Sequence, residues 1–140
     1  PGKLLEDFFA SFEYLRDHKD STGRVGAVGF CYGGGVCNAL AVAYPDMGAS
    51  VPYYGRQPKA EEVAAIKAPL LIHYAEADER INAGWLPYQA ALISKQKLYE
   101  VHFYPETQHG FHNDSTPRFD KAAADLSWQR TLNFFGENLR

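Results

Sequence analysis

The sequence predicts an α/β fold, in which about four mainly parallel strands form a sheet flanked by helices. Helical and strand-like segments alternate along the 140 residues. The strand-like segments are short apolar runs, and the run at residues 70–74 shows no polar alternation. Strands of this kind are covered on both faces, which is typical of parallel sheets joined by right-handed crossovers.

Four strands are expected, each bounded by turn or loop residues. Residues 20–23 read Asp-Ser-Thr-Gly and precede the first strand, and Pro69 precedes the third. Residues of these types favour turns and so separate regular elements. The expected strands are residues 24–30, 49–54, 70–74 and 98–104.

Five helices are expected around these strands. The first begins at about Leu4, has apolar residues at spacings of three and four, and ends near His18. This period is that of an amphipathic helix. Pro45 ends the second helix, because proline cannot continue the helical hydrogen bonds. The other four expected helices are residues 32–44, 59–66, 83–95 and 119–139.

Length and composition indicate one globular domain that spans residues 1–140. Apolar residues make up 46% of the chain and charged residues 22%, and the formal charge is −3. This balance gives no electrostatic basis for binding nucleic acid or an anionic membrane. No segment has the pattern of a membrane span or a signal peptide, and two cysteines do not form a disulfide framework. We therefore expect a cytoplasmic protein without nucleic-acid or membrane partners.

The motif Gly-Phe-Cys-Tyr-Gly-Gly-Gly at residues 29–35 directly follows the apolar run at 25–28, so it ends the first strand and opens the second helix. A tight strand-to-helix turn of this kind exposes its central side chain at the carboxyl edge of a sheet, which makes Cys31 a candidate nucleophile. We expect Gly29 and Gly33 to relieve contacts that a Cβ atom would create. A purely structural glycine turn is the alternative. A Walker loop is excluded because no lysine follows the glycines, and the dinucleotide pattern G-x-G-x-x-G is absent.

Polar residues also follow the third and fourth expected strands. Residues 76–79 contain a candidate acid, with Glu76, Asp78 and Glu79 as rivals. Residues 109–112 contain a candidate base, and His109 is favoured over His112 because it lies nearer the strand and precedes a glycine. The carboxyl ends of parallel strands meet at one edge of a sheet. A thiol, a carboxylate and an imidazole at one edge are the set that nucleophilic acyl transfer requires.

Three stretches and the closing helix resemble the dienelactone hydrolase (carboxymethylenebutenolidase-like) family of the α/β-hydrolase fold. The stretches are Gly-Phe-Cys-Tyr-Gly-Gly at 29–34, Pro-Leu-Leu-Ile-His-Tyr-Ala-Glu-Ala-Asp at 69–78, and His-Gly-Phe at 109–111. The closing helix contributes Asp125, Trp128, Gln129, Arg130, Thr131, Phe134 and Phe135. The resemblance covers essentially the whole chain and implies a truncated α/β-hydrolase fold that lacks the family's N-terminal strands.

The resemblance implies that Cys31 is the nucleophile, Asp78 the acid and His109 the base. It implies small ester or lactone substrates, and neither a metal nor an organic cofactor. The amide of Tyr32 would be one donor to the oxyanion, while the family's second donor lies on a strand–helix loop in the missing portion. The family also binds a substrate carboxylate through an arginine shortly after the catalytic histidine, whereas Arg118 comes later here. A generic short-chain ester is therefore as consistent with the sequence as an acidic lactone.

The expected mechanism is acyl transfer through a thioester on Cys31. We expect the helix N-terminus and a nearby imidazolium to lower the pKa of this thiol. The aromatic side chains of Tyr32, Tyr53 and Trp85 are expected to line the substrate pocket. A thiol-redox role is disfavoured because Cys37, six residues further along the helix, is badly placed to act as a resolving thiol.

The missing strands also suggest an alternative function and an oligomer. Without the second oxyanion donor, the chain is a catalytically weak or silent binding or structural module, active only if a second chain completes the site. The strand at 24–30 would lose a neighbour at one edge, and an unpaired apolar edge favours association. We therefore expect a symmetric homodimer that covers this edge.

Overall fold

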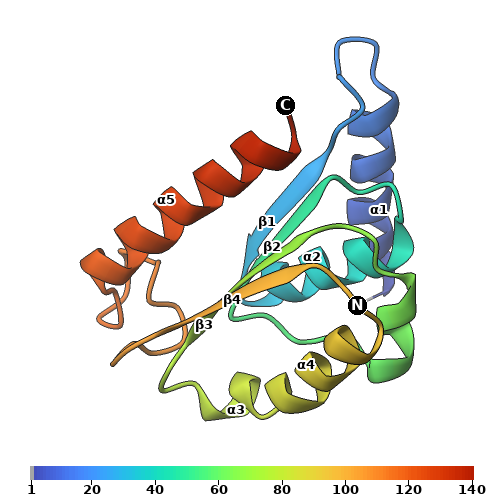
Figure 1. The fold of residues 1–140 in the computed structure, drawn as a ribbon. Helices are drawn as coiled ribbons and strands as arrows, with labels where there is room; N and C mark the ends of the chain where they lie inside the picture. The colour runs from blue at the N-terminus through green and yellow to red at the C-terminus, as the bar shows by residue number, and fades with distance from the viewer. Residues whose placement is uncertain (1) are drawn as a thin grey trace.

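A computed structural model describes residues 2–140 and contains one four-stranded sheet (Figure 1). All three strand pairs are parallel, and the strands lie in the order β1-β2-β3-β4. The predicted fold class is confirmed. The strands are β1 (Gly26–Phe30), β2 (Ala49–Tyr53), β3 (Leu70–Ala75) and β4 (Tyr99–Tyr104).

Helices cover both faces of this sheet. Figure 1 shows α5 on one face, with α1, α2 and α4 on the opposite face. The helix α2 packs against β1 and β2, and α5 packs against β2 and β3. The helices are α1 (Gly2–Asp17), α2 (Tyr32–Ala43), the 3₁₀-helix η1 (Ala60–Ala65), α3 (Glu79–Asn82), α4 (Trp85–Ser94) and α5 (Lys121–Asn138).

The core has two apolar clusters, one on each face of the sheet. The cluster under α1, α2 and α4 contains Leu40, Ile72 and Leu92, and the cluster under α5 contains Val51 and Leu71. All six residues of β3 are buried, as the absence of polar alternation predicts for a strand covered on both faces. The cores therefore hold the sheet between two helical layers and leave the carboxyl ends of its strands for the site.

The structure contains one short helix that the sequence did not predict. The segment expected as a single helix at 83–95 is preceded by the one-turn helix α3, and α4 begins only at Trp85. Asp78 caps α3, because its Oδ1 accepts a hydrogen bond of 3.4 Å from the amide of Ile81. The amide of Gly84 then bonds to the carbonyl of Ile81, three residues back, in a tighter turn than the α-helical four. The prediction located the longer helix but missed the capped turn before it.

Smaller differences have equally local causes. The helix expected at 59–66 is the 3₁₀-helix η1, whose first turn closes through a hydrogen bond of 2.9 Å from the amide of Glu62 to the carbonyl of Lys59. The first strand begins at Gly26 rather than residue 24, because its pairing with β2 starts where Gly26 lies opposite Ala49. Within residues 2–140, β1 pairs with β2 alone. Its other edge is the one on which the homodimer prediction rests, and the homodimer stays a prediction.

A buried polar network ties α5 to the sheet through His73 of β3. The Nδ1 atom of His73 lies 2.8 Å from the hydroxyl of Tyr104, and its Nε2 atom lies 3.1 Å from the hydroxyl of Thr131. Arg130 donates to the Tyr104 hydroxyl at 3.1 Å, and Tyr53 bonds to the Thr131 hydroxyl at 3.0 Å. Because Arg130 can only donate, the proton of Tyr104 is available to Nδ1 and the proton of the imidazole lies on Nε2. Each atom named has a partner when the imidazole is neutral.

Burial holds His73 in this neutral form. It lowers the pKa of His73 to about 3, and the nearby cationic Arg130 acts in the same direction. Charging the ring would add a second proton where Nδ1 accepts its hydrogen bond from Tyr104, and would leave a charge in the core. The network therefore stabilises the fold only while His73 is unprotonated.

We predict that acid weakens the fold through His73. The unfolded chain binds a proton at this imidazole near pH 6.5 while the folded chain excludes it, so stability falls as the pH drops from about 6.5 towards about 3. Between about pH 6.5 and about pH 4.5 the loss from this residue is about 2–3 kcal/mol. Urea denaturation at these two pH values measures it. The His73→Gln variant, although less stable at neutral pH, should lose correspondingly less on acidification, and an equal loss in both proteins contradicts the prediction.

Candidate active site

The turn between β1 and α2 holds Cys31 in a strained conformation at the carboxyl edge of the sheet. Its φ is 56° and its ψ is −118°, a combination that a residue with a Cβ atom rarely adopts. The backbone fixes it there, because the amide of Cys31 donates to the carbonyl of Tyr53 at 3.1 Å and its carbonyl accepts from the amide of Gly34 at 3.0 Å. The side chain of Cys31 is exposed. The strain and the exposure are those expected of a nucleophile at a strand-to-helix turn.

The turn depends on three glycines, of which one was expected and two were not. A Cβ atom at Gly29 would collide with the backbone of Gly33, as predicted. A Cβ atom at Gly33 would meet nothing within 4 Å, so the prediction for this glycine is wrong. The close approach lies instead at Gly34, where a Cβ atom would lie 2.6 Å from the carbonyl oxygen of Tyr53, and at Gly55, which packs against Gly34. The first turn of α2 thus rests directly on the backbone at the end of β2.

Asp78 and His109 meet at the same edge of the sheet. The Oδ2 atom of Asp78 lies 2.6 Å from Nδ1 of His109, and this carboxylate is 7% exposed. Its other oxygen caps α3 through the amide of Ile81. Because the carboxylate accepts the proton of Nδ1, the Nε2 atom of the neutral ring is left as the proton acceptor. The ring of His109 also packs against the ring of Tyr54 at a centroid distance of 4.9 Å.

The rival residues lie elsewhere. His112 contacts the rings of Phe30 and Trp128, at centroid distances of 4.9 and 5.6 Å, rather than a carboxylate. Burial lowers the pKa of His112, which favours the neutral ring. Glu76 accepts a hydrogen bond of 2.6 Å from the amide of Glu106 and so closes the loop after β4. Of the candidate acids, Asp78 is the one that bonds to an imidazole in residues 2–140.

A cavity of about 620 Å³ opens beside Cys31. Tyr54 connects it to the histidine, since Tyr54 lines this cavity together with Cys31 and packs against His109. The cavity carries both signs of charge. Its lining residues are Phe30, Cys31, Tyr54, Gly110, His112, Asn113, Asp114, Arg118, Phe119, Ala124, Asp125 and Trp128.

The pKa of the Cys31 thiol lies above its ordinary value, mainly because the thiol is partly buried. The positive charges of Arg118 and Arg80 pull it down, while the carboxylate of Asp78 raises it. The expectation of a lowered pKa is therefore wrong, because desolvation outweighs the neighbouring cations. The resting side chain is a thiol at neutral pH, and a base is needed to activate it.

Tyr53 and Trp85 are core residues, contrary to the expectation that they line the pocket. Tyr53 is fully buried and its hydroxyl bonds to Thr131. Trp85 is 6% exposed and packs against the ring of Tyr74 at a centroid distance of 5.5 Å. Tyr54, which directly follows Tyr53, lines the cavity together with Cys31 instead. Its φ of 34° turns the chain away from the strand direction. The position of Tyr54 directly after the end of β2 is the sequence feature that could have identified it.

Three further features concern metal binding, the second cysteine and membrane-spanning helices. Among residues 2–140, no three His, Cys, Asp or Glu side chains gather in an arrangement that could hold a metal ion. Cys37 is free and 2% exposed, and burial raises the pKa of its thiol to about 12. No helix in this part of the chain is both long and apolar enough to cross a membrane.

Comparison with known proteins identifies the family. The family model for the dienelactone hydrolase family matches residues 1–139. The chain belongs to the dienelactone hydrolase family. It is 32% identical over 133 residues to a Saccharolobus solfataricus protein assigned as a carboxymethylenebutenolidase, covering 94% of this chain and 51% of the relative. It is also 32% identical over 131 residues to carboxymethylenebutenolidase 1 of Cupriavidus pinatubonensis, covering 91% of this chain and 55% of the relative.

The solved structures agree with this assignment. A protein from Klebsiella pneumoniae assigned as a dienelactone hydrolase superimposes with a TM-score of 0.86 at 26% identity, over 97% of this chain and 61% of that one. The chain spans about half the length of the curated dienelactone hydrolase relatives it matches. Tyr32 is the first residue of α2, so its amide has no hydrogen-bond acceptor within the helix.

We predict opposite outcomes for two neighbouring glycines of the turn. Gly34→Ala should destabilise the protein by about 1–3 kcal/mol or more, because the added methyl group meets the rigid backbone of Tyr53. Gly33→Ala is the matched control and should be neutral or stabilise by up to about 1 kcal/mol, because alanine favours the helix and meets open space. Urea denaturation of the two variants measures the difference. Equal stabilities would contradict the packing described for this turn.

We predict that iodoacetamide modifies Cys31 with a half-maximal rate above about pH 9, the ordinary range for a thiol. Arg118→Gln should move this midpoint further upwards, because it removes a positive charge that lowers the thiol pKa. The Cys31→Ala protein is the control, in which the buried Cys37 should stay unmodified. A midpoint below pH 7 in the unaltered protein would instead indicate a resting thiolate paired with an imidazolium.

Proposed function

We propose that this chain carries the catalytic residues of a hydrolase that cleaves small carboxylic esters or lactones. Cys31 is the nucleophile, His109 the general base and Asp78 the residue that orients the base. The observation that carries the proposal is the hydrogen bond of 2.6 Å between Asp78 and His109, at the sheet edge where the strained turn exposes Cys31. Membership of the dienelactone hydrolase family supports the same class of reaction.

The first half of the reaction forms a thioester. His109 takes the proton of the Cys31 thiol at Nε2, and the sulfur attacks the carbonyl carbon of the ester. The carbon–oxygen bond to the alcohol then breaks, and the imidazolium returns its proton to the departing oxygen. Asp78 stabilises the positive charge that His109 carries between these two proton transfers. A thiol with a raised pKa makes this base necessary.

The second half of the reaction releases the acid. His109 takes a proton from water, whose oxygen attacks the thioester carbon. The carbon–sulfur bond breaks, the sulfur leaves as thiolate and the imidazolium reprotonates it. The amide of Tyr32 is the proposed donor to the oxyanion in both halves, since it points from the first turn of α2 without a helical partner.

The mixed charges of the cavity bear on the substrate. Arg118 lines it, but Asp114 and Asp125 line it as well. This balance does not select strongly for an acidic substrate, so generic short-chain esters and lactones are the proposed class. The free thiols suit a reducing compartment such as the cytoplasm.

A second candidate is a catalytically weak or silent binding module that needs a second chain to complete its site. The chain supplies the Tyr32 amide but no evident second oxyanion donor among residues 2–140. Loss of one such donor typically lowers the rate by about a hundred- to a thousandfold. A homodimer through the open edge of β1 is the proposed assembly for either candidate.

Hydrolysis of p-nitrophenyl acetate separates the two candidates. Cys31→Ala and His109→Ala should each lower kcat/KM to the level of the uncatalysed background, and Asp78→Asn should lower kcat by about a hundred- to ten-thousandfold, because the base loses its orienting partner. His18→Gln, which replaces an imidazole directly after α1, is the control and should hydrolyse the ester normally. Equal rates in the unaltered protein and Cys31→Ala would reject the catalytic proposal and favour the silent module.

A further inference from the structure

β4 forms the second open edge of the sheet, at the opposite end of the strand order from β1 (Figure 1). Within residues 2–140 it pairs with β3 alone. The carbonyl of Leu98 accepts a hydrogen bond of 3.1 Å from the amide of Leu70, at the start of β3. Because backbone groups point to alternate sides along a strand, those of Tyr99, Val101 and Phe103 point towards the open edge. This edge can therefore accept a further strand.

The sequence of β4 lacks the usual protection of an edge strand. Such strands commonly carry lysine or proline, and the six residues of β4, Tyr-Glu-Val-His-Phe-Tyr, contain neither. The surface beside the edge is apolar, since Phe103 is 40% exposed and Leu86 and Ile93 of α4 are 73% and 60% exposed. These two α4 residues share one helix face with Gln89, which bonds to Tyr99 of β4. Exposed apolar surface that surrounds an open edge is typical of an interface with another chain.

The two faces of β4 carry different side chains. Glu100 and His102 lie on the face of the sheet that α5 covers, as their register with β3 shows. The Nε2 atom of His102 lies 2.9 Å from the Oε1 atom of Glu100, whose side chain is exposed. Tyr99, Val101 and Phe103 lie on the opposite face, where Tyr99 and Val101 pack against the core cluster. The edge therefore presents a carboxylate and an imidazole on one face and apolar side chains on the other.

A second copy of β4 can pair antiparallel with the first about a twofold axis, and the position of the axis decides which residues meet. An axis at Glu100 places two carboxylates opposite each other, which is unfavourable. An axis at His102 places two imidazoles opposite each other and leaves the carboxylates outside this pair. An axis at Val101 places Glu100 opposite His102 of the second copy, and does so twice. Because the backbone groups of Val101 point to the edge, the two copies of this residue exchange both hydrogen bonds.

We propose that two copies of this chain pair through β4, antiparallel about an axis at Val101. Each Glu100 carboxylate then lies between its own imidazole and that of the second copy. On the other face, Tyr99 lies opposite Phe103 of the second copy, an aromatic pair of the kind that stabilises paired strands. The two sheets become one continuous sheet. This interface is independent of the proposed reaction, and it uses the edge opposite to that of the β1 homodimer.

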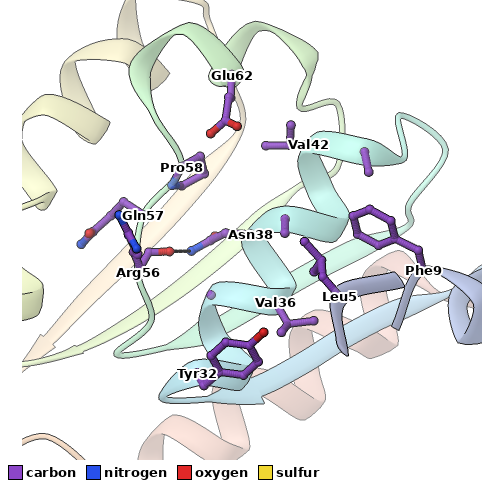
Figure 2. A pocket seen from close by; sticks show the side chains of 13 residues that line it. Leu5, Phe9, Tyr32, Val36, Asn38, Val42, Arg56, Gln57, Pro58 and Glu62 are labelled. Atoms are coloured by element: carbon purple, nitrogen blue, oxygen red, sulfur yellow. Dashed lines mark hydrogen bonds between the residues drawn. The ribbon is translucent and has the colours of Figure 1, made fainter. Parts of the chain in front are cut away.

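The first test measures the mass of the particle by gel filtration with light scattering. Val101→Lys places an ammonium group opposite its own copy at the axis, so it should raise the dissociation constant of the pair about tenfold or more and lower the mass. Val42→Lys is the matched control, because Val42 is also a half-buried valine that packs against the same core cluster. It lies in a separate cavity of about 430 Å³ beside Leu5 and Phe9 of α1 (Figure 2), and its substitution should leave the mass as it is.

A cross-linking measurement tests the register and does not depend on a lysine in the strand. In the Cys31→Ala protein, an added Val101→Cys should form a covalent dimer with oxidised glutathione. The two copies of residue 101 should lie about 5.5 Å apart between Cα atoms, within the range of about 4.4–6.8 Å that a disulfide bridges. Glu100→Cys should cross-link at least about tenfold more slowly, because its two copies lie diagonally, about 7–8 Å apart. Non-reducing electrophoresis measures both rates.

Circular dichroism establishes that each variant is folded, and if Val101→Lys is not, the cross-linking decides alone. A mass that falls in Val101→Lys but not in Val42→Lys, with rapid cross-linking at residue 101, supports the pairing. Equal masses for the unaltered protein and a folded Val101→Lys, or no cross-link at residue 101, overturn it. Faster cross-linking of Glu100→Cys also overturns it, because two carboxylates would then face each other. None of these outcomes depends on whether Cys31 hydrolyses esters.

Discussion

The close contact between the first turn of α2 and the ends of β1 and β2 is the constraint on which the rest of the site depends. Gly29, Gly34 and Gly55 let three stretches of backbone approach one another without side chains between them. This approach holds Cys31 at a positive φ and turns its thiol outwards. It also places Tyr54 beside the thiol, because the amide of Cys31 bonds to the carbonyl of the residue before it. A looser turn would let Cys31 relax into an ordinary conformation and move both side chains.

A second constraint lies in the carboxylate of Asp78, which bonds both to the helix α3 and to His109. Asp78 caps α3 with one oxygen and bonds to His109 with the other, so the short helix and the Asp78–His109 pair hold each other in place. The same carboxylate raises the pKa of the Cys31 thiol, against the cations of Arg118 and Arg80. The thiol of Cys31 therefore stays protonated at neutral pH, so the proposed ester cleavage needs a base that takes up its proton.

A buried hydrogen-bond network lies on the face of the sheet that α5 covers. The network around His73 connects β2, β3, β4 and α5 through hydroxyl and imidazole groups. Its residues do not line the cavity beside Cys31, but the ring of Tyr53 packs against Phe30 and His112 of the cavity wall. The role of the network is to fix the helix that carries Trp128, which forms part of the wall beside Cys31. Packing of α5 on the sheet thus also positions one wall of the cavity beside Cys31.

Local patterns in the sequence determined the element order, the parallel sheet and the strained cysteine turn, because periodicity, glycine spacing and strand ends are encoded by neighbouring residues. They also predicted that Cys31, Asp78 and His109 follow strands at one edge of the sheet, where the structure brings Asp78 and His109 into contact. They could not separate Gly33 from Gly34 or Tyr53 from Tyr54, since a shift of one residue changes which face a side chain occupies and only packing decides it. The thiol pKa depends on desolvation and on charges distant in sequence, and so do both cavities, which form between elements from separate parts of the chain. Contacts of this kind exist only after folding, so the tertiary structure alone decided the chemistry of the thiol and the shape of the space around it.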